Sequence, residues 1–171
     1  MLKSFKTITT FVFDVDGVLT DGSLLIMDNG AMLRKMHVKD GYALQLAIKK
    51  GYQVFIISGS NSPQVKERLT RLGVTNVYMQ VEDKLEKLRN LSSEFNLQKE
   101  DMLFMGDDIP DLEVMQYSGL ACCPADAVSE IKTISKYISP VKGGEGCVRD
   151  VIEKVMKVQG KWIADTNIPS T

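Results

Sequence analysis

Histidine and cysteine, which serve most zinc sites and many nucleophilic enzymes, are scarce in this sequence. The single histidine, His37, has no accompanying Gly-x-Ser-x-Gly motif, which weakens the case for a serine hydrolase or a histidine-rich zinc site. The three cysteines, Cys122, Cys123 and Cys147, are odd in number and include no Cys-x-x-Cys pair. We therefore expect reduced, buried or half-buried thiols in a cytoplasmic protein, and not disulfide partners.

The sequence also lacks an excess of charge of either sign and any long apolar run. Its 21 basic and 22 acidic residues give a net charge of −1, so no basic field exists to attract nucleic acid or an anionic membrane surface. No stretch approaches the roughly 20 apolar residues of a membrane span, and the N-terminal apolar run is too short for a signal peptide. We expect a cytoplasmic protein with neither a nucleic-acid nor a membrane partner.

What remains is the composition of an ordinary globular protein, with 171 residues, 44% of them hydrophobic and 25% charged. A chain of this length is most simply one domain with a core large enough to need no disulfide or structural metal. We assign residues 1–158 to that domain. Residues 159–171, which lose the helical pattern after Trp162, are expected to form a tail that is loosely ordered or docked on a neighbouring subunit.

Short apolar runs alternate with amphipathic stretches along the chain. The expected strands are 11–13, 54–57, 77–79 and 102–105; the expected helices are 42–50, 63–73, 83–95, 110–117, 125–134 and 146–158. Continuous apolar runs separated by helices predict a doubly wound α/β fold around a mainly parallel sheet. Residues 22–38 interrupt the alternation, because 23–27 and 31–38 flank an Asp28-Asn29-Gly30 turn that is typical of a β-hairpin.

Polar residues of a particular kind stand at the ends of the expected strands, where ligands bind in α/β sheets. The carboxylates are Asp14, Asp16 and Asp21 after the first strand and Asp107, Asp108 and Asp111 after the fourth. Ser58 follows the second strand, and Lys84 opens the helix after the third. Converging carboxylates repel one another unless a cation neutralises them, and Mg²⁺ prefers oxygen ligands and completes its shell with a phosphate oxygen. A hydroxyl and an ammonium group suit the other phosphate oxygens.

Each of these residues has a simpler explanation when taken alone. An aspartate after a strand is usually a turn or helix-cap residue, a serine there is usually a cap, and a helix lysine is usually solvated. Their joint occurrence, in this order and each at a strand end or helix start, favours a site for phosphoryl transfer.

The same motifs resemble a known family. The segment Asp14–Asp21 (DVDGVLTD) is similar to the first motif of the haloacid dehalogenase (HAD) superfamily of phosphatases, and Ser58, Lys84 and Gly106–Asp111 (GDDIPD) resemble its second, third and fourth motifs. The resemblance implies a HAD-like Rossmannoid fold and a magnesium-dependent phosphatase in which Asp14 is the nucleophile that forms an aspartyl-phosphate. Asp16 would act as the general acid and base.

The resemblance also implies the remaining site roles. The side chains of Asp14 and Asp107 and the main-chain carbonyl of Asp16 would bind Mg²⁺, and Asp108 and Asp111 would support that shell. Ser58 and Lys84 would hold the phosphoryl oxygens.

The spacing leaves no room for the cap domain that many HAD enzymes insert. Only 41 residues separate Asp16 from Ser58, and 25 separate Ser58 from Lys84. Capless members resemble the 3-deoxy-D-manno-octulosonate 8-phosphate (KDO-8-phosphate) phosphatases of lipopolysaccharide biosynthesis, which are homotetramers assembled through the hairpin. The segment 37–42 (HVKDGY) is similar to their substrate-contacting segment, and 143–150 (GGEGCVRD) to their glycine-rich C-terminal motif. By position, the implied sugar contacts are His37, Val38, Lys39, Asp40, Gly41, Gln45, Ser60, Arg68 and Lys84.

Ser60 departs from the family pattern, since these enzymes often have arginine there. A phosphatase for a nine-carbon sugar acid, such as KDN-9-phosphate or an acylneuraminate 9-phosphate, is therefore kept as an alternative. A receiver-like phospho-accepting module and a non-catalytic HAD-like protein are more distant alternatives. The receiver arrangement fits poorly because the second strand ends in serine, and both Asp14 and Asp16, which a non-catalytic protein would lack, are present.

Overall fold

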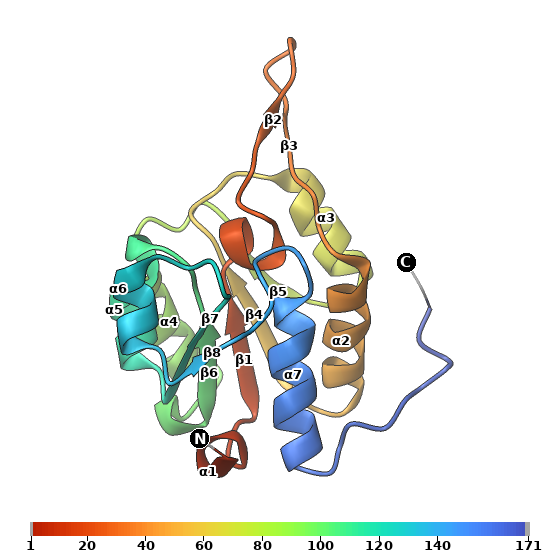
Figure 1. Cartoon of the computed structure of the whole chain (residues 1–171), viewed down its shortest axis with the longest axis vertical. Helices are drawn as coiled ribbons and strands as arrows, with labels where there is room; N and C mark the ends of the chain where they lie inside the picture. The colour runs from red at the N-terminus through yellow and green to blue at the C-terminus, as the bar shows by residue number, and fades with distance from the viewer. Residues whose placement is uncertain (1, 170–171) are drawn as a thin grey trace.

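A computed structural model of the protein describes residues 2–169. Six parallel strands form one sheet in the order β5-β4-β1-β6-β7-β8 (Figure 1). The strands are β1 (Thr10–Phe13), β4 (Gln53–Ile57), β5 (Asn76–Tyr78), β6 (Met102–Met105), β7 (Leu120–Cys123) and β8 (Tyr137–Ile138). In the register of the sheet, Phe11 of the central strand β1 lies opposite Val54 on one side and Leu103 on the other.

Helices cover both faces of the sheet (Figure 1). They are α1 (Leu2–Phe5), α2 (Val38–Lys49), α3 (Pro63–Arg71), α4 (Lys84–Glu94), α5 (Leu112–Tyr117), α6 (Ser129–Ile134) and α7 (Cys147–Val158). Successive strand residues point to opposite faces, so Phe11 and Phe13 belong to the core under α2, α3 and α7, whereas Val12 belongs to the core under α4, α5 and α6. The doubly wound α/β prediction is confirmed.

The sequence pattern found four of the six strands and missed β7 and β8. The missed strand β7 is the run Leu120-Ala-Cys-Cys123, whose residues are mostly small and not β-branched, and β8 has only two residues. Therefore β7 lacks the composition, and β8 the length, that marks a strand in sequence. Cys122 and Cys123 lie on β7, Cys147 opens α7, and all three are free and buried, as expected.

The hairpin lies after β1 as expected, but it is shorter than the sequence pattern indicated. Its paired strands are β2 (Leu25–Ile26) and β3 (Met32–Leu33), and they project beyond the rest of the molecule (Figure 1). The expected second strand, 31–38, and the expected helix start at Tyr42 are corrected, because α2 already begins at Val38. His37 caps that helix, with its Nδ1 accepting a hydrogen bond from the Lys39 N–H at 3.2 Å.

Residues after α7 form no helix or strand as far as Pro169, and they lie against α2 of the same chain. Trp162 meets Tyr42 edge to face with ring centroids 6.3 Å apart, and Asp165 forms an ion pair with Lys49 at 2.5 Å. The expected loose order is therefore corrected for the tail as far as Pro169, while docking on a neighbouring subunit stays a prediction. Among residues 2–169, no helix is long and apolar enough to cross a membrane.

Candidate active site

The loops after β1, β4 and β6 meet at one edge of the sheet, on either side of the central strand. They enclose a pocket of about 310 Å³. Its lining residues are Asp14, Asp16, Gly17, Gly22, Ser58, Gly59, Ser60, Lys84, Asp107, Asp108, Pro110 and Asp111. The structure thus brings together in one pocket every residue for which a catalytic or metal-binding role was predicted, because parallel strands end at the same edge.

A buried lysine connects two of the carboxylates. Lys84, the first residue of α4, places its Nζ 3.0 Å from Asp14 Oδ1 and 2.7 Å from Asp111 Oδ1. Burial acts to lower the pKa of Lys84, but Asp14 and Asp111 outweigh it and the pKa is raised, so the lysine carries its charge. The other oxygen of Asp111 accepts the Asp107 N–H at 3.1 Å. Asp111 thus fixes both Lys84 and the main chain at Asp107.

The pocket contains more buried negative charge than Lys84 neutralises. Burial, followed by the proximity of Asp111, raises the pKa of Asp14 to about 7, although Lys84 opposes this shift. Burial, followed by the proximity of Asp14 and Asp111, raises the pKa of Asp107 to about 8. Carboxylate oxygens of these three aspartates lie within 4.8 Å of one another. A cluster of hard oxygen donors that resists ionisation fits a divalent cation such as Mg²⁺.

The turn that follows β1 determines how close Asp107 can come. Val15–Leu19 forms a single wide turn in which Gly17 has a φ of 80°, a conformation that favours glycine. A Cβ at Gly17 would lie 2.0 Å from Asp107 Oδ2, so only glycine admits the carboxylate here. The glycine-rich motif packs behind this turn, since a Cβ at Gly143 would lie 1.9 Å from the Gly17 carbonyl oxygen. That motif supports the turn and does not line the pocket.

Asp16 differs from Asp14 in its partner. Its carboxylate is held from the hairpin side by Arg34, with Nε 2.6 Å from Oδ1 and Nη2 3.1 Å from Oδ2. Arg34 follows β3, and nothing in the sequence pattern singled it out. An arginine on a ribbon of apolar residues, 18 positions from Asp16, gives no local signal; only the folded hairpin shows the contact.

The remaining polar side chains that line the pocket are those of Ser58, Ser60 and Asp108. Ser58 is buried at the end of β4, and its Oγ lies 3.0 Å from the Ser60 Oγ and accepts the Ser60 N–H at 3.2 Å. Asp108 lines the pocket but accepts a hydrogen bond from the Ile109 N–H, so its carboxylate caps the short turn that follows. Position 60 is serine, where the enzymes of the resemblance often have arginine.

Most of the predicted sugar contacts do not line this pocket. The predicted segment 37–41 forms the start of α2, and Gln45 on the same helix donates to the Pro169 carbonyl at 3.2 Å. Arg68 lies on α3 and lines a separate groove beneath the hairpin with Met32, Arg34 and Met36. Of the predicted sugar contacts, only Ser60 and Lys84 line the pocket in the described single chain.

Asp40, within that segment, is a buried carboxylate with a structural contact. Its Oδ1 accepts the Arg149 N–H at the start of α7 at 2.7 Å, while Oδ2 has no hydrogen-bond partner. Burial raises the pKa of Asp40 to about 7. This residue joins α2 to the N-terminus of α7.

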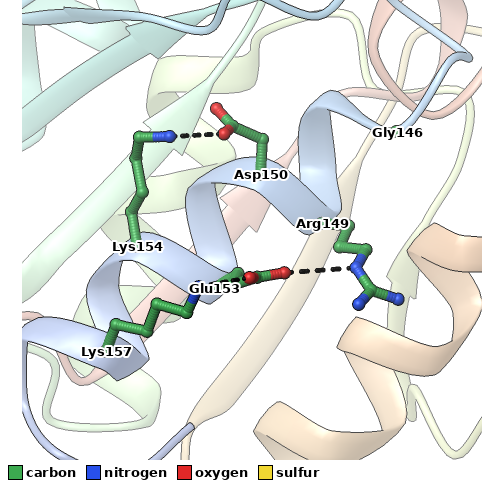
Figure 2. Close-up of a pocket in the computed structure, with 6 residues that line it drawn as sticks. All are labelled: Gly146, Arg149, Asp150, Glu153, Lys154 and Lys157. Atoms are coloured by element: carbon green, nitrogen blue, oxygen red, sulfur yellow. Dashed lines mark hydrogen bonds and ion pairs between the residues drawn. The ribbon is translucent and has the colours of Figure 1, made fainter.

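A second hollow, along the outer face of α7, has a different character (Figure 2). Arg149 pairs with Glu153, and Lys154 pairs with Asp150, at distances of 3.2 and 2.5 Å. Figure 2 shows that each of the two carboxylates is paired with a basic side chain along one helix. Pairs of this kind stabilise a helix surface and offer no group for chemistry.

Comparisons with known proteins agree with this geometry. A model of the haloacid dehalogenase-like hydrolases matches residues 77–151. The 3-deoxy-D-manno-octulosonate 8-phosphate phosphatase KdsC of Escherichia coli strain K12 is 33% identical over 161 residues, which cover 94% of this chain and 86% of the relative. The chain belongs to this phosphatase family.

Solved structures show the same fold. The phosphatase of that name from Yersinia pestis matches with a TM-score of 0.91 and 32% identity, covering 94% of this chain and 86% of the other. One from Moraxella catarrhalis, in complex with a magnesium ion, a phosphate ion and a KDO molecule, matches with a TM-score of 0.91 and 30% identity, covering 94% and 92%. Membership of the family makes the protein a HAD-type phosphatase and sets aside the receiver-like and non-catalytic alternatives.

Proposed function

We propose that this phosphatase is a cytoplasmic, magnesium-dependent enzyme that hydrolyses KDO-8-phosphate to KDO and phosphate. The observation that supports it most is the pocket itself, in which Asp14 and Asp107 are buried close to Asp111, so that their ionisation is unfavourable unless a further cation is bound. The relatives named above act on, or bind, this sugar acid. Three free, buried cysteines agree with a reducing compartment.

In the proposed mechanism, an oxygen of Asp14 attacks the phosphorus in line with the leaving oxygen. The new bond joins Asp14 to phosphorus while the bond to the sugar oxygen breaks, and Asp16 gives that oxygen a proton. Asp16 then takes a proton from the water that hydrolyses the aspartyl-phosphate, which returns Asp14 to its carboxylate. Ser58 and Lys84 hold the phosphoryl oxygens. The charge of Lys84 stabilises the transition state most, because negative charge develops on those oxygens there.

The site would hold Mg²⁺ through the side chains of Asp14 and Asp107 and the Asp16 carbonyl, with Asp108 and Asp111 in support. When bound, the cation neutralises the carboxylates and the phosphoryl group, so that one anion can approach another. Asp111 contributes by fixing Lys84 and the Asp107 main chain, as its two hydrogen bonds indicate.

For the oligomeric state, we propose a homotetramer that assembles through the hairpin. Leu25, Ile26 and Met32 are 62, 71 and 54% exposed, which is unusual for apolar side chains on a two-stranded ribbon in water. The single-chain pocket is lined by few of the predicted sugar contacts, so a neighbouring subunit would supply the rest of the sugar site. Burial against a second copy accounts for both features.

One observation keeps a second substrate class in view. Ser60 is hydrogen-bonded to Ser58, and position 60 lacks the guanidinium that would bind a sugar carboxylate. A nine-carbon sugar-acid phosphate, such as KDN-9-phosphate or an acylneuraminate 9-phosphate, is therefore the alternative.

A substrate panel tests the proposal directly. Phosphate release is measured with Mg²⁺ from KDO-8-phosphate, KDN-9-phosphate, N-acetylneuraminate 9-phosphate and a hexose phosphate. The expected order of kcat/KM places KDO-8-phosphate first. A higher value for a nine-carbon substrate would replace the substrate assignment, and undiminished activity after rigorous metal removal would overturn the proposed mechanism.

A further inference from the structure

Arg34 reaches back from the hairpin to Asp16. Its guanidinium approaches the carboxylate with two nitrogens, Nε at 2.6 Å from Oδ1 and Nη2 at 3.1 Å from Oδ2. The Arg34 side chain is only 7% exposed, although Leu33 beside it is 48% exposed. Two parallel hydrogen bonds from a planar guanidinium fix the orientation of a carboxylate as well as its position.

The other contacts of the turn after β1 (Val15–Leu19) fix the main chain of Asp16 more than its carboxylate. The buried Thr20 Oγ1 accepts the N–H groups of Gly17 and Gly22, each at 3.3 Å, and this holds the turn. Its hydrogen bond to Asp16 Oδ1 is long, at 3.4 Å. The Asp16 side chain is 34% exposed. Arg34 is therefore the partner that decides where this carboxylate points.

We infer that Arg34 is a positioning residue, which acts on the reaction by aiming Asp16 at the leaving oxygen. This inference rests on the proposed function, because it assigns Asp16 the role of general acid and base. A carboxylate offers about four lone-pair directions. The guanidinium of Arg34 uses two of them and the Thr20 hydroxyl a third, so a lone pair on Oδ2 stays available for proton transfer. An acid or base held by a third group is the usual arrangement in nucleophilic enzymes.

A neighbouring ion pair provides the contrast. Lys35, the next residue, pairs with Asp21 at 2.9 Å, but its side chain is 70% exposed. Exposed ion pairs of this kind contribute little to the free energy of unfolding. Both pairs join the hairpin to the loop after β1, so Lys35→Met is a matched control for the loss of a hairpin cation.

The test separates positioning from general support through the leaving group. An alkoxide leaving group needs a proton from Asp16, whereas p-nitrophenolate departs without one. Arg34→Met should therefore lower kcat/KM for KDO-8-phosphate by about 10- to 100-fold, part of the usual contribution of a positioned acid. For p-nitrophenyl phosphate, kcat/KM should fall less than about 3-fold, and Arg34→Lys should restore part of the alkyl activity.

A double-variant cycle with Asp16→Asn completes the experiment, with the oligomeric state of each variant measured by sedimentation. If Arg34 acts through Asp16, adding Arg34→Met to Asp16→Asn should cause no further loss. Equal losses on both esters, additive losses in the double variant, or an equal effect of Lys35→Met would each overturn the inference while the wild-type enzyme stays active. A wild-type protein that releases phosphate from no ester would instead overturn the proposed function and, with it, this inference.

Discussion

The acidic pocket and the hairpin above it are built in opposite ways. In the pocket, polar side chains are buried and bonded, and Lys84 satisfies two carboxylates at once. In the hairpin, apolar side chains are exposed, with Ile26 71% accessible at the end of the molecule. The proposed catalytic and metal-binding side chains of the pocket all come from one chain, whereas the hairpin exposes an apolar surface. The polar contacts of the pocket lie within the single chain, whereas the exposed apolar hairpin is the basis of the proposed assembly.

Breaking the pocket at its nucleophile should have the largest effect. Asp14→Asn should abolish phosphate release, because an amide is a poor nucleophile and a weaker metal ligand. The measurement is phosphate release from the best substrate of the panel, with Asp28→Asn in the exposed hairpin turn as the control. Full turnover by Asp14→Asn would show that the nucleophile is misassigned.

Asp16 lies where the two regions meet, and its loss should be severe but incomplete. Asp16→Asn should lower turnover by ~10²–10⁴, the usual contribution of a positioned acid and base. Metal affinity should change little, because the proposed metal contact is the main-chain carbonyl. Turnover and Mg²⁺ affinity are measured on the same preparation. A loss of metal affinity that matches the loss of rate would contradict the assigned role.

The two regions also differ in how far sequence could predict them. The pocket residues stand at strand ends, and the order of strands in a parallel sheet makes their convergence predictable. Arg34 could not be found in this way, because its partner lies across a hairpin whose fold decides the contact. The start of α2 was missed for a similar reason, since the cap from His37 extends the helix to residues that read as a strand. The strand β7 has no β-branched residue and β8 has only two residues, so neither gives a strand pattern in the sequence.

Charging the hairpin should separate assembly from chemistry. Replacing Leu25 and Met27 with glutamates should yield smaller species, because an apolar contact between copies would then bury charge. These species should still hydrolyse p-nitrophenyl phosphate but lose about tenfold or more in kcat/KM for the sugar-acid phosphate, since few sugar contacts lie in the single-chain pocket. Sedimentation and kinetics are compared with Ile163→Glu, an exposed apolar residue outside the hairpin. A wild-type monomer with full activity on the sugar-acid phosphate would contradict the proposal.

The smallest expected effect concerns the stability of the pocket without metal. Asp14 and Asp107 have pKa values raised to about 7 and about 8, against 3.8 for the ordinary group. Between pH 3.8 and these raised values the folded protein retains protons that the unfolded chain has lost. The free energy of unfolding therefore falls progressively over this range as the pH rises, and levels off above the folded-state pKa values. The melting temperature of metal-free protein should therefore drop between about pH 5 and about pH 8.5, by at least ~5 °C.

Magnesium should reverse that loss where the carboxylates are ionised, and so raise the melting temperature much more at about pH 8.5 than at about pH 5. Asp107→Asn should flatten part of the pH dependence and remove most of the response to Mg²⁺. Asp40 supplies the matched control, because burial raises its pKa to about 7 as well, yet it lies outside the pocket against the start of α7. Asp40→Asn should therefore flatten part of the pH dependence while the response to Mg²⁺ persists. A Mg²⁺ response that is equal at both pH values would show that the buried carboxylates are not the groups that the cation neutralises.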